Sequence, residues 1–447
     1  MMNFIYSFFN QPSIIIGLIT MIGLIALRKP ISDVLSGTFK TILGFIILSS
    51  GGGIISDTLV EYFIPAFENA FHMQGVMPTN EAVIGAAQSM FGTEMALIMG
   101  LGFLINILLA RLSKLKYIFL TGHMVLFMSG LIAVVLATLG FEGAELVIIG
   151  SLLNGIIMII SPAITQPYMR KATGSNDIAM GHYNGFNYMF CAWISKLVGN
   201  KEQSTEDVKV SDKWNFFRES TLTLSIVMTI IFVITYIFAD PAVTTELSGG
   251  DNIIMFAVIQ GLTFGAGFII VLYGVRMMLG EIVPAFKGIS EKIVPDAIPA
   301  FDVPVIYPYA PNAVLIGFIA STIGSLVMML LCPALGLPVI LLGDGVFFVG
   351  AGVGVLANKT GGLRGTIISS FINGVLLTLL PALMLPMMSS LGFSGSTFGD
   401  CDFAIIGIIL GFLGNTFGRM GIYGLLAILL VIIFIPSFIP KKEKSSN

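Results

Sequence analysis

The run TGHMVLFMSGLIAVVLATLG, residues 121–140, sets the class of this protein. It holds one histidine and otherwise only apolar or small uncharged residues. A helix of about 20 such residues is long enough to cross the hydrocarbon core of a bilayer. Comparable runs recur along the 447-residue chain, which is 56% hydrophobic and 11% charged. We therefore predict an all-α polytopic membrane protein.

Composition and motifs exclude several other classes. The formal charge of −3 and the mean hydropathy of +0.96 give no indication of nucleic acid or any polyanionic partner. The three cysteines stand singly, so we expect neither a disulfide framework nor a zinc site. The first residues lack a basic segment and a small-residue cleavage site, and we expect no removable signal peptide. We expect no cofactor, no metal ligands and no catalytic residues, because no nucleotide-binding loop and no nucleophile motif is present.

Charged residues alternate along the chain in a way that predicts topology. Basic clusters such as RLSKLK (111–116) alternate with acidic stretches that lack basic residues, such as 240–251. The positive-inside rule places the basic clusters in the cytoplasm. About eleven crossings place every loop on the side that its charges predict, with the N-terminus outside and the C-terminus inside. The predicted spans lie near 13–27, 38–56, 94–110, 117–140, 145–166, 221–239, 252–279, 312–332, 337–357, 366–388 and 403–436.

Two stretches, 172–200 and 281–311, do not fit a simple span. The first is too polar, and prolines recur in the second from Pro284 to Pro311, which argues against one continuous helix there. Interrupted backbone at membrane depth is tolerated only when it is buried in protein or lines a water-filled cavity. We predict re-entrant or interfacial segments. An amphipathic helix on the cytoplasmic surface is the alternative.

A short internal echo favours a duplicated architecture. PTNEAVIG (78–85) in the first half resembles PNAVLIG (311–317) in the second, and each follows a Phe-Lys pair. Duplicated halves that each contribute an interrupted segment are common in transporters, with the substrate held where the halves meet. The sequence therefore predicts an internal repeat.

Four ionisable residues are candidates for function because charge at membrane depth costs free energy. They are His123 in the opening run, His182 in AMGHYNGFNYMF (179–190), Asp302 among the prolines, and Glu81 ahead of an outer half-helix. Each has a structural alternative. The histidines could pack with satisfied hydrogen bonds, and the two carboxylates could cap helices.

Histidine, asparagine and carboxylate side chains together offer many hydrogen-bond donors and acceptors, which suits a small polyhydroxylated molecule. A metal site is the competing interpretation. The two histidines have no metal-ligand spacing, however, and are surrounded by amides and aromatic rings. The residues thus favour a carbohydrate-like ligand.

Four stretches carry a family resemblance: IFLTGHMVLFMSGLIAV, the run AMGHYNGFNYMFCAWISKLVGNKEQSTEDVKV, LYGVRMMLGEIVPAFKGIS and IPAFDVPVIYPYAPNAVLIGF. They resemble the membrane (IIC) component of ascorbate-type sugar phosphotransferase systems (PTS). The resemblance implies a homodimer of about eleven spans per protomer, with a core domain that carries the substrate and a second domain that dimerises. It also implies that 1–447 forms one IIC domain without a IIA or IIB domain.

The resemblance implies a permease of the bacterial cytoplasmic (inner) membrane. Such a protein transports L-ascorbate or another small sugar or sugar acid and couples transport to phosphorylation. The phosphate comes from a phosphocysteine on a separate IIB protein, which a IIA protein recharges. Whether the IIC chain itself counts as an enzyme is left open. An ion-coupled secondary transporter, in which the same residues relay protons, is the alternative function.

The resemblance also assigns the site. The two family histidines match His123 and His182, and the aspartate matches Asp302. The family's two glutamines are replaced by Phe127 and Tyr183, and the tip of its outer half-helix is matched by Glu81, so discrimination against ascorbate is expected. The predicted substrate-binding residues are Glu81, His123, His182, Tyr183, Asn184 and Asp302, with Thr121, Phe127 and Asn312 as further possible lining.

Overall fold

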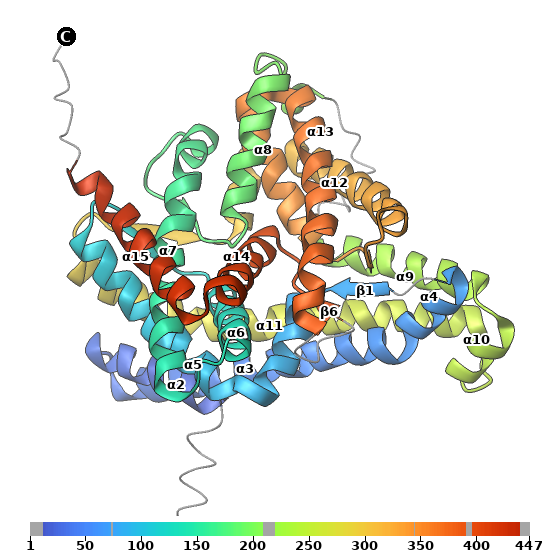
Figure 1. The fold of residues 1–447 in the computed structure, drawn as a ribbon, viewed down its shortest axis with the longest axis horizontal. Helices are drawn as coiled ribbons and strands as arrows, with labels where there is room; N and C mark the ends of the chain where they lie inside the picture. Colours follow the sequence, from blue (N-terminus) through green and yellow to red (C-terminus); the bar gives the residue numbers. More distant parts are fainter. Residues whose placement is uncertain (1–11, 73–74, 209–219, 344, 390–395, 439–447) are drawn as a thin grey trace, which may run out of the picture.

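The computed structural model describes residues 12–72, 75–208, 220–343, 345–389 and 396–438. Helices make up most of these ranges (Figure 1). Short 3-10 helices η2 (Thr205–Asp207), η4 (Val303–Tyr309) and η5 (Pro333–Leu335) and a π-helix, η1 (Thr58–Phe63), join them. The α-helices are α2 (Pro12–Ala26), α3 (Ile31–Asp57), α4 (Ile64–Phe71), α5 (Asn80–Leu112), α6 (Gly122–Thr138), α7 (Gly143–Thr173), α8 (Gly185–Val198), α9 (Ser220–Phe238), α10 (Pro241–Leu247), α11 (Ile253–Ile293), α12 (Pro311–Leu331), α13 (Gly345–Ser389), α14 (Cys401–Phe417) and α15 (Arg419–Phe438).

The predicted polytopic helical class is confirmed. Within the described ranges, seven helices are long and apolar enough to cross a membrane, and three shorter helices are apolar as well. Two of the seven, Ile31–Phe71 and Phe348–Met387, are about twice the length that one crossing requires. The number of crossings and their direction therefore stay predictions.

One predicted span is wrong. The run 403–436 was expected to form a single crossing, but it contains parts of two helices, α14 and α15. Gly418 separates them with φ of 59° and ψ of −152°, a conformation that is open to glycine and to almost no other residue. Arg419 directly follows the break, inside the stretch expected to cross as one helix.

The prediction for 281–311 is wrong in its first part. Helix α11 continues through Pro284 to Ile293, and the interrupted backbone begins only after it. A proline inside a helix removes one backbone hydrogen bond and crowds the carbonyl four residues earlier, here that of Gly280, and this can bend a helix without ending it.

Two three-stranded parallel sheets connect the halves of the chain. In one sheet β1 (Gly75–Pro78) lies between β5 (Val339–Ile340) and β6 (Ser396–Thr397). In the other, β4 (Ile298–Phe301) lies between β2 (Tyr117–Phe119) and β3 (Ala179–Met180). The middle strand of each sheet comes from one half of the chain, and its two neighbours come from the other. The halves are therefore interlocked.

The elements around the two sheets follow one another in the same order. Strand β1 leads into α5, and β4 leads through η4 into α12. Each outer strand is followed within a few residues by a helix: β2 by α6, β3 by α8, β5 by α13 and β6 by α14. The matching motifs PTNEAVIG and PNAVLIG cover the starts of α5 and α12, which agrees with the predicted echo.

Glycine and serine residues bring long helices into close contact. Helices α3 and α11 run side by side in Figure 1, with Gly44 against the backbone of α11. Between α12 and α13, Ser321 and Ser325 donate hydrogen bonds to the carbonyls of Ser370 and Gly374 at 2.8 and 2.9 Å. Small residues and interhelical hydrogen bonds stabilise helix pairs in lipid, where the hydrophobic effect contributes little.

We expect Gly324→Ala to destabilise the α12–α13 pair. A Cβ at Gly324 would collide with the carbonyl oxygen of Phe371, so the helices must separate, at a cost of about 1–3 kcal/mol. Thermal unfolding in detergent measures the change. Gly424→Ala on α15 is the control, because that Cβ would meet nothing within 4 Å. Equal melting temperatures for the two variants would show that the contact is unimportant.

Candidate functional site

Polar residues gather at one edge of the β2–β4–β3 sheet. Because the three strands are parallel, their carboxyl ends lie at the same edge. His123 follows β2, His182 follows β3 and Asp302 directly follows β4. Backbone pairing thus brings together three residues that are far apart in sequence.

The carboxylate of Asp302 lies between the two imidazoles. Its Oδ2 is 3.4 Å from Nε2 of His123, and its Oδ1 is 4.0 Å from Nε2 of His182. The side chain of His182 is 3% exposed and that of His123 15%, whereas Asp302 is 37% exposed. The carboxylate therefore faces the accessible side of the group. Among the described residues, no group of three His, Cys, Asp or Glu side chains is arranged to hold a metal ion.

Asp302 also caps a helix. Its Oδ1 accepts a hydrogen bond from the backbone N–H of Val303 at 2.8 Å, at the start of η4. The capping role that the sequence left as an alternative is therefore real. It leaves Oδ2 facing His123, so one carboxylate serves both functions.

Several buried polar atoms at this edge have no hydrogen-bond partner within the described part of the chain. They belong to Thr121 (Oγ1), His123 (Nδ1), His182 (Nδ1) and Tyr188 (the hydroxyl). An unpaired buried polar group costs about 1–3 kcal/mol. A cost repeated over four residues is typical of a site whose partners come from a bound molecule.

Tyr188 was not singled out from the sequence. Its ring centroid lies 6.1 Å from that of His182, and its side chain is fully buried. The available signal was its position in AMGHYNGFNYMF, the motif that carries His182. Tyr188 lies on α8 and not in the loop with His182, so the sequence did not indicate that the two side chains are close.

Tyr183 and Asn184 make their polar contacts inside the protein. The hydroxyl of Tyr183 donates to Oδ1 of Asn154 at 3.2 Å, and its ring stacks on Phe119 with centroids 4.7 Å apart. Oδ1 of Asn184 accepts a hydrogen bond from the N–H of Cys401, whereas its Nδ2 is buried without a partner among the described residues. Both side chains hold the segment that carries His182.

The other predicted lining residues lie in different surroundings. Phe127 is buried, with its ring edge-on to His123 at a centroid distance of 5.7 Å. The backbone N–H of Asn312 donates to the carboxylate of Glu206, and its side-chain amide donates to the carbonyls of Thr205 and Val208. Glu81 is the second residue of α5, but its side chain is outside the described part of the structure.

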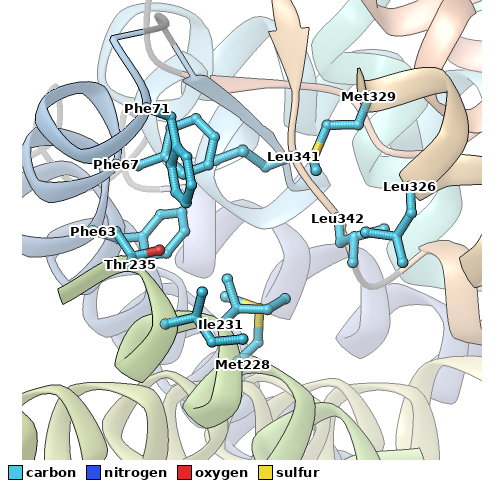
Figure 2. Close-up of a pocket in the computed structure, with 11 residues that line it drawn as sticks. Phe63, Phe67, Phe71, Met228, Ile231, Thr235, Leu326, Met329, Leu341 and Leu342 are labelled. Carbon is cyan, nitrogen blue, oxygen red and sulfur yellow. The ribbon is translucent and has the colours of Figure 1, made fainter. Parts of the chain in front are cut away.

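A separate cavity of about 160 Å³ has a different chemistry (Figure 2). Among its described lining residues, only Thr235 carries a polar side chain. Such a lining cannot pair with several hydroxyl groups, so this cavity does not fit a carbohydrate. It is lined by Phe63, Phe67, Phe71, Met228, Ile231, Ile234, Thr235, Leu326, Met329, Leu341 and Leu342.

Comparison with known proteins identifies the family. Residues 7–402 match the sequence pattern of EIIC-GAT, described as a PTS system sugar-specific permease component. The chain belongs to the EIIC-GAT family. The PTS resemblance of the sequence motifs is thereby confirmed.

One curated relative of this EIIC-GAT protein is the "Ascorbate-specific PTS system EIIC component" of Mycoplasma pneumoniae (strain ATCC 29342 / M129 / Subtype 1). The two are 26% identical over 440 residues, which cover 83% of the present chain. The chain spans 64% of the relative's length.

We expect Asp302→Ala to lower the stability of this EIIC-GAT protein and Asp302→Asn to preserve it. Alanine removes the cap on Val303, a loss of about 1 kcal/mol. Asparagine keeps an oxygen for Val303 and offers an amide to the histidines. Thermal unfolding of both variants checks this. An asparagine variant as unstable as the alanine variant would contradict the capping role.

Proposed function

We propose that this chain is the IIC permease for L-ascorbate or a related small sugar acid, sugar or polyol. It carries its substrate across the bacterial cytoplasmic membrane while a phosphorylated IIB protein supplies the phosphate. The observation that carries the proposal is the His123–Asp302–His182 group, set among unpaired polar atoms in a sugar-permease family member.

The site chemistry supports a hydroxyl-rich substrate. A neutral imidazole offers one donor and one acceptor, and a carboxylate accepts from two or more hydroxyls. Thr121 and Tyr188 each add a hydroxyl that can donate and accept. We propose that His123, His182 and Asp302 contact the substrate, together with Thr121, Tyr188 and Glu81. Phe127 packs against His123, and Tyr183 and Asn184 hold the segment that carries His182.

Fewer observations support ascorbate as the substrate than support a hydroxyl-rich substrate in general. The relative that shares 26% of aligned residues carries an ascorbate-specific name. At Phe127 and Tyr183 the ascorbate-type pattern has glutamines, and here one side chain is apolar and the other is bonded to Asn154. Fewer groups can reach a hydroxyl at these positions. We therefore keep other small carbohydrates as substrates of equal standing.

We further propose the assembly and topology that accompany this function. The chain forms a single IIC domain over 1–447, with about eleven crossings, the N-terminus outside and the C-terminus inside. It contains a core domain and a dimerisation domain, related by an internal repeat, and pairs as a homodimer. IIA and IIB act as separate proteins. The two interlocked sheets support the repeat.

Uptake in cells with and without the IIB protein tests the function. We expect phosphorylated substrate to accumulate only when IIB is present. A thermal-shift screen of the purified protein against ascorbate, sugar acids, pentitols and hexitols identifies the substrate, because a ligand that binds the folded state raises its melting temperature. Uptake of unmodified sugar that persists without IIB and collapses with an uncoupler would favour the ion-coupled transporter.

We expect His182→Ala to abolish uptake while the protein still inserts into the membrane. The variant removes one imidazole from the group around Asp302, while the loop keeps the bonds of its backbone, from Oγ of Ser161 to the carbonyl of His182 and from the N–H of Gly181 to Phe301. His72→Asn is the matched control, because His72 is exposed and has φ of 51°, a conformation that asparagine tolerates. Wild-type uptake kinetics in the His182 variant would contradict the assignment of His182 to the substrate site.

A further inference from the structure

Helices α8 and α14 begin at the same place and exchange their caps. Asn184 is the N-cap residue of α8, but its Oδ1 accepts a hydrogen bond from the N–H of Cys401, the first residue of α14, at 3.2 Å. Asp402 lies on α14, and its Oδ2 accepts from the N–H of Phe186 on α8 at 3.1 Å. Each helix thus supplies the oxygen that its neighbour requires.

This arrangement has an electrostatic reason. The first N–H groups of a helix lack partners within it, and the N-terminus carries a partial positive charge. Two N-termini that meet therefore repel each other unless negative charge lies between them. Asp402, which is 1% exposed, supplies a carboxylate that bonds to α8, whereas Asp400, the buried N-cap residue of α14, accepts from Nδ2 of Asn80. An amide alone, such as Asn184, supplies an acceptor without charge.

The loop that carries His182 ends at this junction. The N–H of Gly181 donates to the carbonyl of Phe301 at 2.7 Å, and Oγ of Ser161 donates to the carbonyl of His182 at 3.1 Å. The first turn of α8 follows at once, and it holds Tyr188 through a backbone bond to Asn184. A shift of this turn would move His182 and Tyr188 together.

Asp402 itself does not face a polar space. Its second oxygen, Oδ1, has no hydrogen-bond partner among the described residues. The residue borders a cavity of about 100 Å³ whose other lining side chains, apart from Ser161, are apolar residues of α7, α8, α14 and α15. A hydroxyl-rich substrate would find no further partners there, so contact with the substrate is not its role.

We infer that Asp402 is a positioning residue of the binding site. Its carboxylate fixes the start of α8 and thereby sets His182 and Tyr188 against Asp302. The expected effect on uptake rests on the function proposed above. The expected effect on the structure of the His182 loop does not.

Hydrogen exchange and uptake kinetics of three variants test the inference. Asp402→Ala should speed amide exchange in 181–190 and raise KM by about tenfold, the loss expected for one hydrogen bond to a charged group. The exchange variant Asn184→Asp with Asp402→Asn keeps one carboxylate and one amide at the junction. It should restore both measurements to near wild type. Asp240→Ala removes a similar cap, the Asp240 bond to Ala242 on α10, and should change neither.

Two results would overturn the inference. One is wild-type amide exchange and KM in Asp402→Ala. The other is an exchange variant that folds but behaves like Asp402→Ala. If the exchange variant does not fold, Asp402→Asn replaces it, and this variant should lie between wild type and alanine because it keeps an acceptor for Phe186. Amide exchange needs no substrate, so it decides the inference even if no carbohydrate in the panel binds.

Discussion

Backbone N–H and C=O groups within a bilayer must find partners in the protein, because lipid offers none. This chain breaks its helices several times, and each break exposes such groups. Short parallel strands supply the missing bonds. A strand of two to four residues needs another strand as its hydrogen-bond partner. In this chain the partner comes from the other half. The polar site arises at the edge of one of these pairings.

The same requirement explains why side chains at the breaks have more than one role. Asp302 caps η4 and lies between two imidazoles. Asn184 accepts a hydrogen bond from the first turn of α14, and Asp402 accepts one from the first turn of α8, so each side chain caps the neighbouring helix. In water, solvent would complete these bonds, and the side chains would be free to vary. In a membrane the loss of one side chain leaves a backbone group unpaired as well.

Much of the fold could be predicted from the sequence, because long apolar runs indicate spanning helices directly. The division at Gly418 was missed, because apolar residues continue on both sides of Asn415, Thr416 and Arg419 and the break depends on the backbone conformation of one glycine. The strands were also missed, because two to four residues show no periodicity. The grouping of His123, His182 and Asp302 was anticipated through family resemblance and has no signal in spacing. The internal partner of Tyr183 was hidden, because Asn154 lies 29 residues earlier on another helix.

The interlocked sheets bear on how the protein is made. Strand β1 ends at Pro78, and its partner β5 begins at Val339, more than 250 residues later. At ribosomal speeds of about 5–20 residues per second, β1 waits on the order of tens of seconds for that partner. During this interval its unpaired peptide groups must remain in water, in the insertion machinery or against a chaperone. Biogenesis of this transporter therefore cannot be completed one half at a time.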